Sequence, residues 1–299
     1  MDTMGTVIGS RAPASGTQAQ RARRGLLLFG LLLLPLSLFG YWFYDVAEAR
    51  GLPLGTSLPI MLAPGLASVI TRLVLREGFA DVSFKIGGTR RAILFALALP
   101  LLVGTVAYSG AYITGLAQFT PPPAPSFLAW AGSFGSFVFL MALVATLGTL
   151  VLLPTAAGEE IGWRGYLLPR LIEAGVPHPI LLSGLIWGAW HMVPVFTAGY
   201  AAGASPLLSA LGLMIAILAF GYILSWMRLD TGSVWPAVVG HAAWNAMING
   251  GFDLATGGEN AKLWTGESGF LVVLVLVVVT VLVGRARRSA APGASTFKG

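Results

Sequence analysis

The fold is decided by the stretch from residue 25 to 44, GLLLFGLLLLPLSLFGYWFY, which contains no charged side chain. A helix needs about 20 mainly apolar residues to cross a membrane. Further runs of this kind are long and continuous rather than short and alternating, which favours helices over barrel strands. The sequence therefore predicts an all-α, polytopic membrane helical bundle of about eight transmembrane helices. The other runs cover residues 52–75, 92–115, 127–153, 179–198, 206–227, 232–249 and 268–284.

The composition agrees with a chain that lies mostly in lipid. Of the 299 residues, 56% are hydrophobic and only 10% are charged, whereas soluble domains are about 25% charged. There is no cysteine, which excludes disulfides, thiol nucleophiles and cysteine-ligated zinc. The net charge is +6, but no basic patch has interleaved aromatic residues, so we expect no nucleic-acid binding.

The basic residues predict the orientation of the helices. If the runs alternate in direction, 16 of the 18 Lys and Arg residues fall on one side, and only Arg50 and Lys262 fall on the other. Because Lys and Arg concentrate in cytoplasmic loops, we expect a multi-pass protein of the cell membrane with both termini in the cytoplasm. The first run also has features of a signal peptide, but its length favours a retained helix.

Two adjacent glutamates lie just beyond the fourth run, in the sequence GEEIGWRG at residues 158–165. Glu160 and Arg164 are four residues apart and can pair on one helix face. Glu159 then lies on another face and is available as a general base. Ionisable groups at membrane depth are costly, so they are candidates for function. The alternative is an ion pair that merely ends the membrane span.

Two of the three histidines lie inside predicted spans. His191 follows Trp187 by four residues in the fifth span, and His241 precedes Asn245 by four in the seventh. The second spacing places both side chains on one helix face, where they can donate hydrogen bonds to a single point, as in an oxyanion hole. The alternative is that these side chains join neighbouring helices. His178, between two prolines, is expected to be structural.

Together these residues can hydrolyse a peptide bond without a covalent nucleophile. Glu159 would take a proton from water, His191 would orient that water, and His241 with Asn245 would hold the oxyanion. A metal variant would use Glu159, His191 and His241 as ligands of one divalent metal such as zinc. There is no H-E-x-x-H sequence, so we expect no firmly bound metal, and both mechanisms stay open.

Other intramembrane protease classes fit less well. Gly266-Glu267-Ser268-Gly269 is similar to the G-x-S-G of rhomboid serine proteases, but no histidine follows it. Tyr44-Asp45 is similar to the Tyr-Asp of presenilin-type aspartyl proteases, but the Gly-x-Gly-Asp partner is missing. Neither pattern offers a complete set of catalytic groups.

The three motifs, in their order, resemble the CPBP family, which comprises type II CAAX prenyl proteases and bacteriocin-processing or immunity proteins (the Abi family). The resemblance runs from about residue 127 to 250 and implies eight helices around a polar cavity open to the cytoplasm. It also implies that Glu159 activates water and His191 assists. It further implies that His241 and Asn245 form the oxyanion hole, with Glu160 and Arg164 in support. One departure is visible, because Trp187 stands where the family usually has Phe.

The resemblance also suggests how the chain is organised. We expect a disordered cytoplasmic segment over 1–20, N-terminal transmembrane helices over 21–126, and a CAAX-protease-like catalytic core over 127–250. An outer loop and the last helix would follow over 251–284, and a basic cytoplasmic tail over 285–299.

Three functions are in competition for this sequence. The leading one is an intramembrane endopeptidase that acts on peptide or lipidated-protein substrates within membrane lipid. The second is a scaffold or bacteriocin-immunity protein on the same fold, without enzymatic activity. The third is a proton-coupled transporter, since intramembrane Glu and His can relay protons, but the repeated halves typical of transporters are missing.

Overall fold

The computed structural model describes residues 16–51, 57–123, 125–127, 132–197 and 205–290, and these are almost entirely helical. The prediction of an all-α polytopic bundle is therefore confirmed. The helices are α1 (Gly16–Ala49), α2 (Leu58–Leu75), α3 (Arg90–Ile113), α4 (Gly132–Leu143), α5 (Thr149–Gly162), α6 (Leu168–Glu173), α7 (Pro179–Thr197), α8 (Pro206–Thr231), α9 (Trp235–Trp244), α10 (Ala261–Trp264) and α11 (Phe270–Ala290).

Short elements complete the chain. Three π-helical turns continue the α-helices: η3 (Val144–Gly148), η4 (Trp163–Leu167) and η5 (Asn245–Phe252). Two 3-10 turns are η1 (Ala80–Val82) and η6 (Asp253–Ala255). One antiparallel pair of two-residue strands joins β1 (Gln118–Phe119) to β2 (Thr256–Gly257).

Seven of the eight predicted spans are helices long and apolar enough to cross a membrane. The exception is the predicted span 232–249, which is formed by α9 and η5. These elements are helical throughout, but His241, Asn245 and Asn249 lower their hydropathy. Neighbouring helices bury most of this segment, including His241 at 4% exposure, so it need not be apolar to lie within the bundle.

The fourth pass is much longer than predicted. The sequence suggested a span over 127–153, but one continuous helix runs from Gly132 to Glu173, through α4, η3, α5, η4 and α6. Residues 128–131 lie outside the described part. Glu159 is therefore in the interior of this helix and not at its end. Buried partners compensate the charges on its second half, so they do not end the helix.

Both ends of the chain contain more helix than predicted. Helix α1 begins at Gly16, so residues 16–20 are not disordered, and α11 continues to Ala290 through much of the expected basic tail. Residues 1–15 and 291–299 lie outside the described residues.

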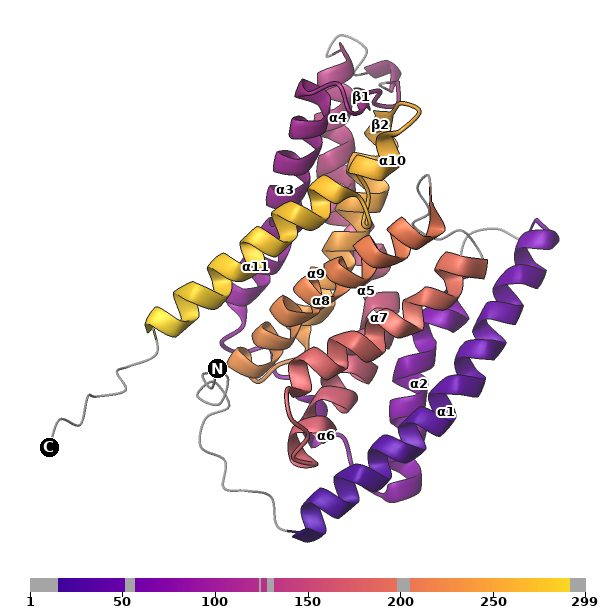
Figure 1. The fold of residues 1–299 in the computed structure, drawn as a ribbon, viewed down its shortest axis with the longest axis vertical. Coiled ribbons are helices and arrows are strands. Elements are labelled where there is room, and N and C mark those ends of the chain that lie inside the picture. The colour runs from indigo at the N-terminus through magenta and orange to yellow at the C-terminus, as the bar shows by residue number, and fades with distance from the viewer. Residues whose placement is uncertain (1–15, 52–56, 124, 128–131, 198–204, 291–299) are drawn as a thin grey trace, which may run out of the picture.

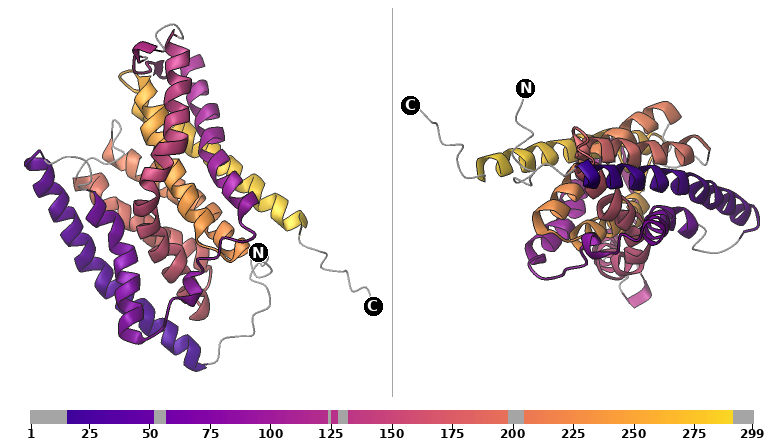
Figure 2. Two further views of the ribbon diagram at one scale, coloured as in Figure 1. Left: turned by 180° about the vertical axis from the view of Figure 1, so that it is seen from behind. Right: turned by 90° about the horizontal axis from the view of Figure 1, so that it is seen from below.

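The helices form a bundle whose two flanks spread apart at one end (Figure 1). Helices α1 and α2 pack together on one flank, and α3, α4 and α11 form the other. Between the flanks lie α5, α7, α8 and α9, and α8 is the most buried of the spans. The reverse view shows the same separation, with the β1–β2 pair at the far tip of the second flank (Figure 2). Leucines on the outer face of α1 are exposed, as suits contact with lipid.

Glycines bring α2 and α5 into close contact beside the two glutamates. A Cβ atom added at Gly65 would lie 2.6 Å from the carbonyl oxygen of Gly158. One added at Gly162 would lie 2.4 Å from Pro64. Small residues at such crossings allow membrane helices to approach closely. The glycines that flank Glu159 and Glu160 thus fix the depth and direction of both carboxylates.

Candidate active site

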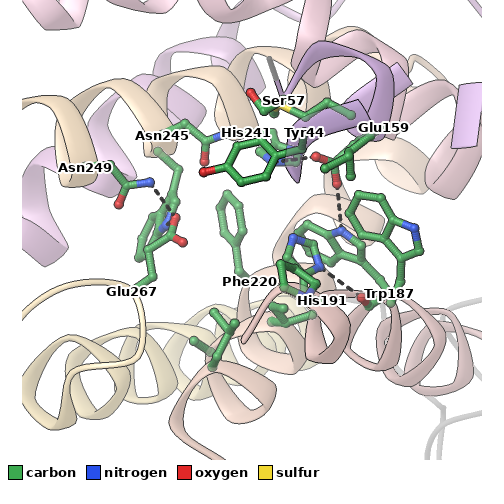
Figure 3. Close-up of a pocket in the computed structure, with 18 of the residues that line it drawn as sticks. Tyr44, Ser57, Glu159, Trp187, His191, Phe220, His241, Asn245, Asn249 and Glu267 are labelled. Atoms are coloured by element: carbon green, nitrogen blue, oxygen red, sulfur yellow. Dashed lines mark hydrogen bonds and ion pairs between the residues drawn. The ribbon is translucent and has the colours of Figure 1, made fainter. Parts of the chain in front are cut away.

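A cavity of about 470 Å³ lies between α1, α2, α7, α8 and α9, and the structure brings all four predicted catalytic residues to its wall (Figure 3). Glu159 comes from α5, His191 from α7, His241 from α9 and Asn245 from the first position of η5. Aromatic side chains form much of the remaining wall. The predicted cavity inside the bundle is thus present, with polar groups set in a mainly apolar wall, and its size suits a short segment of peptide.

Glu159 is held by two indole groups. Its side chain is only 3% exposed, and Oε2 accepts hydrogen bonds from Nε1 of Trp187 at 2.9 Å and of Trp163 at 3.3 Å. The other oxygen, Oε1, lies 3.9 Å from Nε2 of His241. One carboxylate oxygen is therefore fixed by hydrogen bonds. The other, directed toward His241, can accept a proton from water in the cavity.

Glu160 connects two of the predicted side chains. Its Oε1 accepts a hydrogen bond from Arg164 at 2.8 Å, which confirms the predicted pair. The same oxygen lies 2.9 Å from Nδ1 of His241, so that nitrogen carries a hydrogen and donates it. This second contact was not predicted, because it joins residues far apart in the sequence. It aims Nε2 of His241 toward Glu159.

His191 and Asn245 also lie on the cavity wall. Nδ1 of His191 is 3.0 Å from the carbonyl oxygen of Trp187, so it donates its hydrogen there and leaves Nε2 as an acceptor. The ring packs edge-on against Trp187 and Trp190. Asn245 follows His241 by one turn and faces the same cavity (Figure 3).

Several cavity residues were not identified from the sequence. Tyr41 and Tyr44 of α1 both line the cavity, and Tyr41 donates to the carbonyl oxygen of Trp190 at 2.9 Å. Glu267 also lines it and accepts hydrogen bonds from Trp244 and Asn249. No local pattern indicated these roles, since each depends on the packing of distant helices.

The rejected protease patterns can also be located. Ser268 lines a separate apolar groove beside α11 and does not share the wall of Glu159 and His191. Asp45 lies on the cavity wall. His178 is in the turn before α7 with a φ of 51°, and its carbonyl oxygen accepts from Leu182, the contact of a structural residue.

The residues proposed for the metal variant do not form a metal site. Among the described residues, no three His, Asp or Glu side chains are grouped so that they could hold a metal ion. Nδ1 of His241 is directed to Glu160, and Nδ1 of His191 is directed to a backbone carbonyl. Glu159, His191 and His241 share a cavity, but in the described structure they are not grouped closely enough to hold a metal ion together.

Buried ion pairs close one end of the bundle, which we call the closed end (residues Arg72, Asp81, Arg164, Arg170 and Arg228). Arg170 pairs with Asp81 at 2.8 Å and with Glu77 and Glu173. Burial alone would raise the pKa of Asp81, but the hydrogen bond and charge of Arg72 and the charge of Arg170 lower it below its usual value. These ion pairs fill the space between Glu159 and the closed end with side chains.

The cavity opens toward the opposite end, which we call the open end (residues Tyr44, Ser57, Thr197, Asn249 and Glu267). All five line the cavity. Four of them lie near the ends of α1 and α7 or the starts of α2 and α11, and Asn249 lies in η5. The start of α1 and the end of α11 lie at the closed end (Figure 1). The expected cytoplasmic cavity and the expected cytoplasmic termini therefore cannot both be correct.

Fold and site together define a class: polytopic membrane proteins with a glutamate–histidine centre buried within the bundle. Residues 136–247 match the family described as type II CAAX prenyl endopeptidase Rce1-like. The chain is also 27% identical over 150 residues to the CAAX prenyl protease 2 of Methanococcus maripaludis. The aligned region covers 48% of this chain and 52% of that protein. Through this core the chain is similar to the CPBP, or Rce1-like, family. It spans about half the length of the curated relative.

Proposed function

We propose that the chain is an intramembrane endopeptidase that hydrolyses peptide bonds with a water activated by Glu159. The observation that carries this proposal is the buried Glu159 carboxylate at the base of a cavity, with Nε2 of His241 3.9 Å from it. The match to a family of CAAX prenyl endopeptidases supports the reaction class.

In the proposed reaction, Glu159 takes a proton from water while the water oxygen forms a bond to the scissile carbonyl carbon. The carbonyl π electrons move to its oxygen, and His241 and Asn245 donate hydrogen bonds to that oxyanion. The tetrahedral intermediate then collapses, the carbon–nitrogen bond breaks, and Glu159 delivers its proton to the leaving nitrogen. His191 orients the water through Nε2, while its Nδ1 is held by the carbonyl oxygen of Trp187.

The charge balance suits this role for His241. Two carboxylates, Glu159 and Glu160, lie beside one guanidinium, Arg164, and all three side chains are buried. A protonated His241 would make the group of four neutral, which lowers the cost of burying it. Its Nδ1 would donate to Glu160 and its Nε2 would be free to donate to the oxyanion.

The substrate class follows from the wall of the cavity and from the family. Aromatic and aliphatic side chains dominate that wall, which favours an apolar peptide segment or one that carries a lipid. We therefore propose membrane-associated or lipidated protein segments as substrates. The mechanism we propose needs no metal, since the candidate ligands are not grouped closely enough in the described structure to hold one together.

The test compares purified wild type in lipid with Glu159→Gln and with the matched control Asp230→Asn. Asp230 is 55% exposed and pairs only with Arg287 at the surface. Prenylated and unmodified fluorogenic peptides would be offered with and without a chelator. Loss of general-base action should lower kcat/KM by about 10² to 10⁴ in Glu159→Gln alone. Cleavage that survives this substitution would refute the mechanism, and loss with chelator would restore the metal variant. No cleavage by any folded variant would favour the scaffold or immunity function.

A further inference from the structure

The direction in which the cavity opens can be compared with the distribution of charge. The cavity residues outside the glutamate–histidine centre lie toward the open end, and Ser57 and Thr197 stand at the limits of their helices. Ser57, Tyr44, Asn249 and Glu267 border the same space in Figure 3. A substrate that reaches Glu159 must therefore pass these residues.

No such path exists at the closed end. Trp163 and Tyr166 are completely buried directly after the glutamates, and Arg164 is 1% exposed. Arg228 extends from α8 and donates hydrogen bonds to the carbonyl oxygens of Arg164 and Asp81. These contacts fill the region between Glu159 and the closed end with side chains, so access is one-sided.

The closed end also holds nearly all the basic residues. In the described part of the chain, the open end has only Arg50 and Lys262. Because positive residues concentrate on the cytoplasmic side of membrane proteins, the closed end should face the cytoplasm. The described basic residues of the closed end are Arg21, Arg23, Arg24, Arg72, Arg76, Lys85, Arg90, Arg91, Arg164, Arg170, Arg228, Arg285, Arg287 and Arg288.

We infer that the cavity opens to the extracytoplasmic side of the membrane. Under the proposed function, on which this step rests, the substrates are then peptide segments presented from outside the cell or from the outer leaflet. Asp45 and Glu267 line the opening, and no Lys or Arg of the described residues does. The entrance is therefore acidic and favours segments that carry positive charge.

The natural absence of cysteine makes a direct test possible. Ser57→Cys places one thiol at the entrance, and Ser289→Cys places one at the exposed end of α11 as the matched control. A membrane-impermeant maleimide would be added to intact cells and then to permeabilised cells. We expect Ser57→Cys to be labelled in intact cells and Ser289→Cys only after permeabilisation.

The opposite pattern, or labelling of Ser57→Cys only after permeabilisation, would overturn the inference. Equal labelling of both variants in detergent, with elution like wild type, would show that each variant is folded. Labelling requires no catalysis, so its failure is distinct from failure of the proposed function. Thr197→Cys provides a second thiol at the entrance, on another helix, and it should behave like Ser57→Cys.

Discussion

At the closed end of the bundle the buried arginines Arg72, Arg164 and Arg170 pair with carboxylates, whereas at the open end the acidic side chains Asp45 and Glu267 line a cavity. Arg170 alone contacts three carboxylates. Glu267 instead accepts hydrogen bonds from an indole and an amide. Buried ion pairs fill space and hold helices together, while polar groups on a cavity wall border space that water or a substrate can enter.

Glu159 and Glu160 are adjacent in the sequence, but one lies on the cavity wall and the other in a buried ion pair. Glu160 is fully buried and is shared by Arg164 and His241. Glu159 has no arginine partner and reaches the cavity wall. We therefore expect substitutions toward the closed end to reduce stability, and substitutions on the cavity wall to reduce activity.

The largest effect on stability should come from Arg170→Met. This change removes the guanidinium and leaves Glu77, Asp81 and Glu173 without their common partner. Breaking a buried ion pair from one side costs about 3 to 5 kcal/mol. Thermal unfolding in detergent would measure the loss.

The matched control for this change is Arg287→Met. Arg287 pairs with Asp230 at 3.1 Å, and both side chains are partly exposed. Pairs of this kind contribute about 1 kcal/mol or less. Equal destabilisation by the two substitutions would contradict the idea that ion pairs lock the closed end.

An effect on stability of intermediate size is expected at Asp253, the first residue of η6. Burial raises its pKa from 3.8 to about 6, with the charge of Glu267 adding to the rise, although a hydrogen bond from Tyr108 and the charge of Lys262 oppose it. The folded state therefore holds this proton more tightly than the unfolded state. The stabilisation that comes from this shift should be present in full below pH 4 and be lost as the pH rises to about 6, by at most about 3 kcal/mol.

Asp253→Asn should remove this part of the pH dependence. Its melting temperature should change less between pH 4 and pH 7 than that of wild type. Asp230→Asn, at an exposed carboxylate, should keep the wild-type dependence. A profile of Asp253→Asn that follows the wild type would show that Asp253 does not titrate in this range.

Much of the fold could be predicted, because an apolar run is a local property of the sequence. The helices α2, α3, α7, α8 and α11 begin or end close to the predicted positions. The fourth pass could not be predicted in the same way. Its second half carries Glu159, Glu160 and Arg170, and only their distant partners make these charges compatible with a continued helix.

The candidate site also has a part that could be predicted from local sequence and a part that could not. The spacing of four between Glu160 and Arg164 predicted a pair that the structure contains. The contact of Glu160 with His241, and the presence of Tyr44 and Glu267 on the cavity wall, depend on which helices lie side by side. A single sequence without its relatives does not specify those neighbours.

Trp187 was noticed in the sequence, but its contact with Glu159 depends on the packing of helices. Its substitution gives the smallest predicted effect. The sequence identified it as a departure from the Phe usual in this family, and the structure shows that its indole donates to Glu159 at 2.9 Å. Phe keeps the aromatic packing but cannot donate. A hydrogen bond to a charged group contributes about 1.5 to 3 kcal/mol, so Trp187→Phe should lower kcat by roughly ten- to a hundredfold.

The control is Trp226→Phe, because the Nε1 of Trp226 is buried without a hydrogen-bond partner among the described residues and lies outside the cavity. It should leave kcat unchanged. If Trp187 merely packs, Trp187→Phe should also leave kcat unchanged while the melting temperature shifts. A fall in kcat at constant melting temperature would instead show that the indole positions the carboxylate. Single hydrogen bonds would then position the side chain of Glu159 on the cavity wall, whereas ion pairs hold the side chains of the closed end.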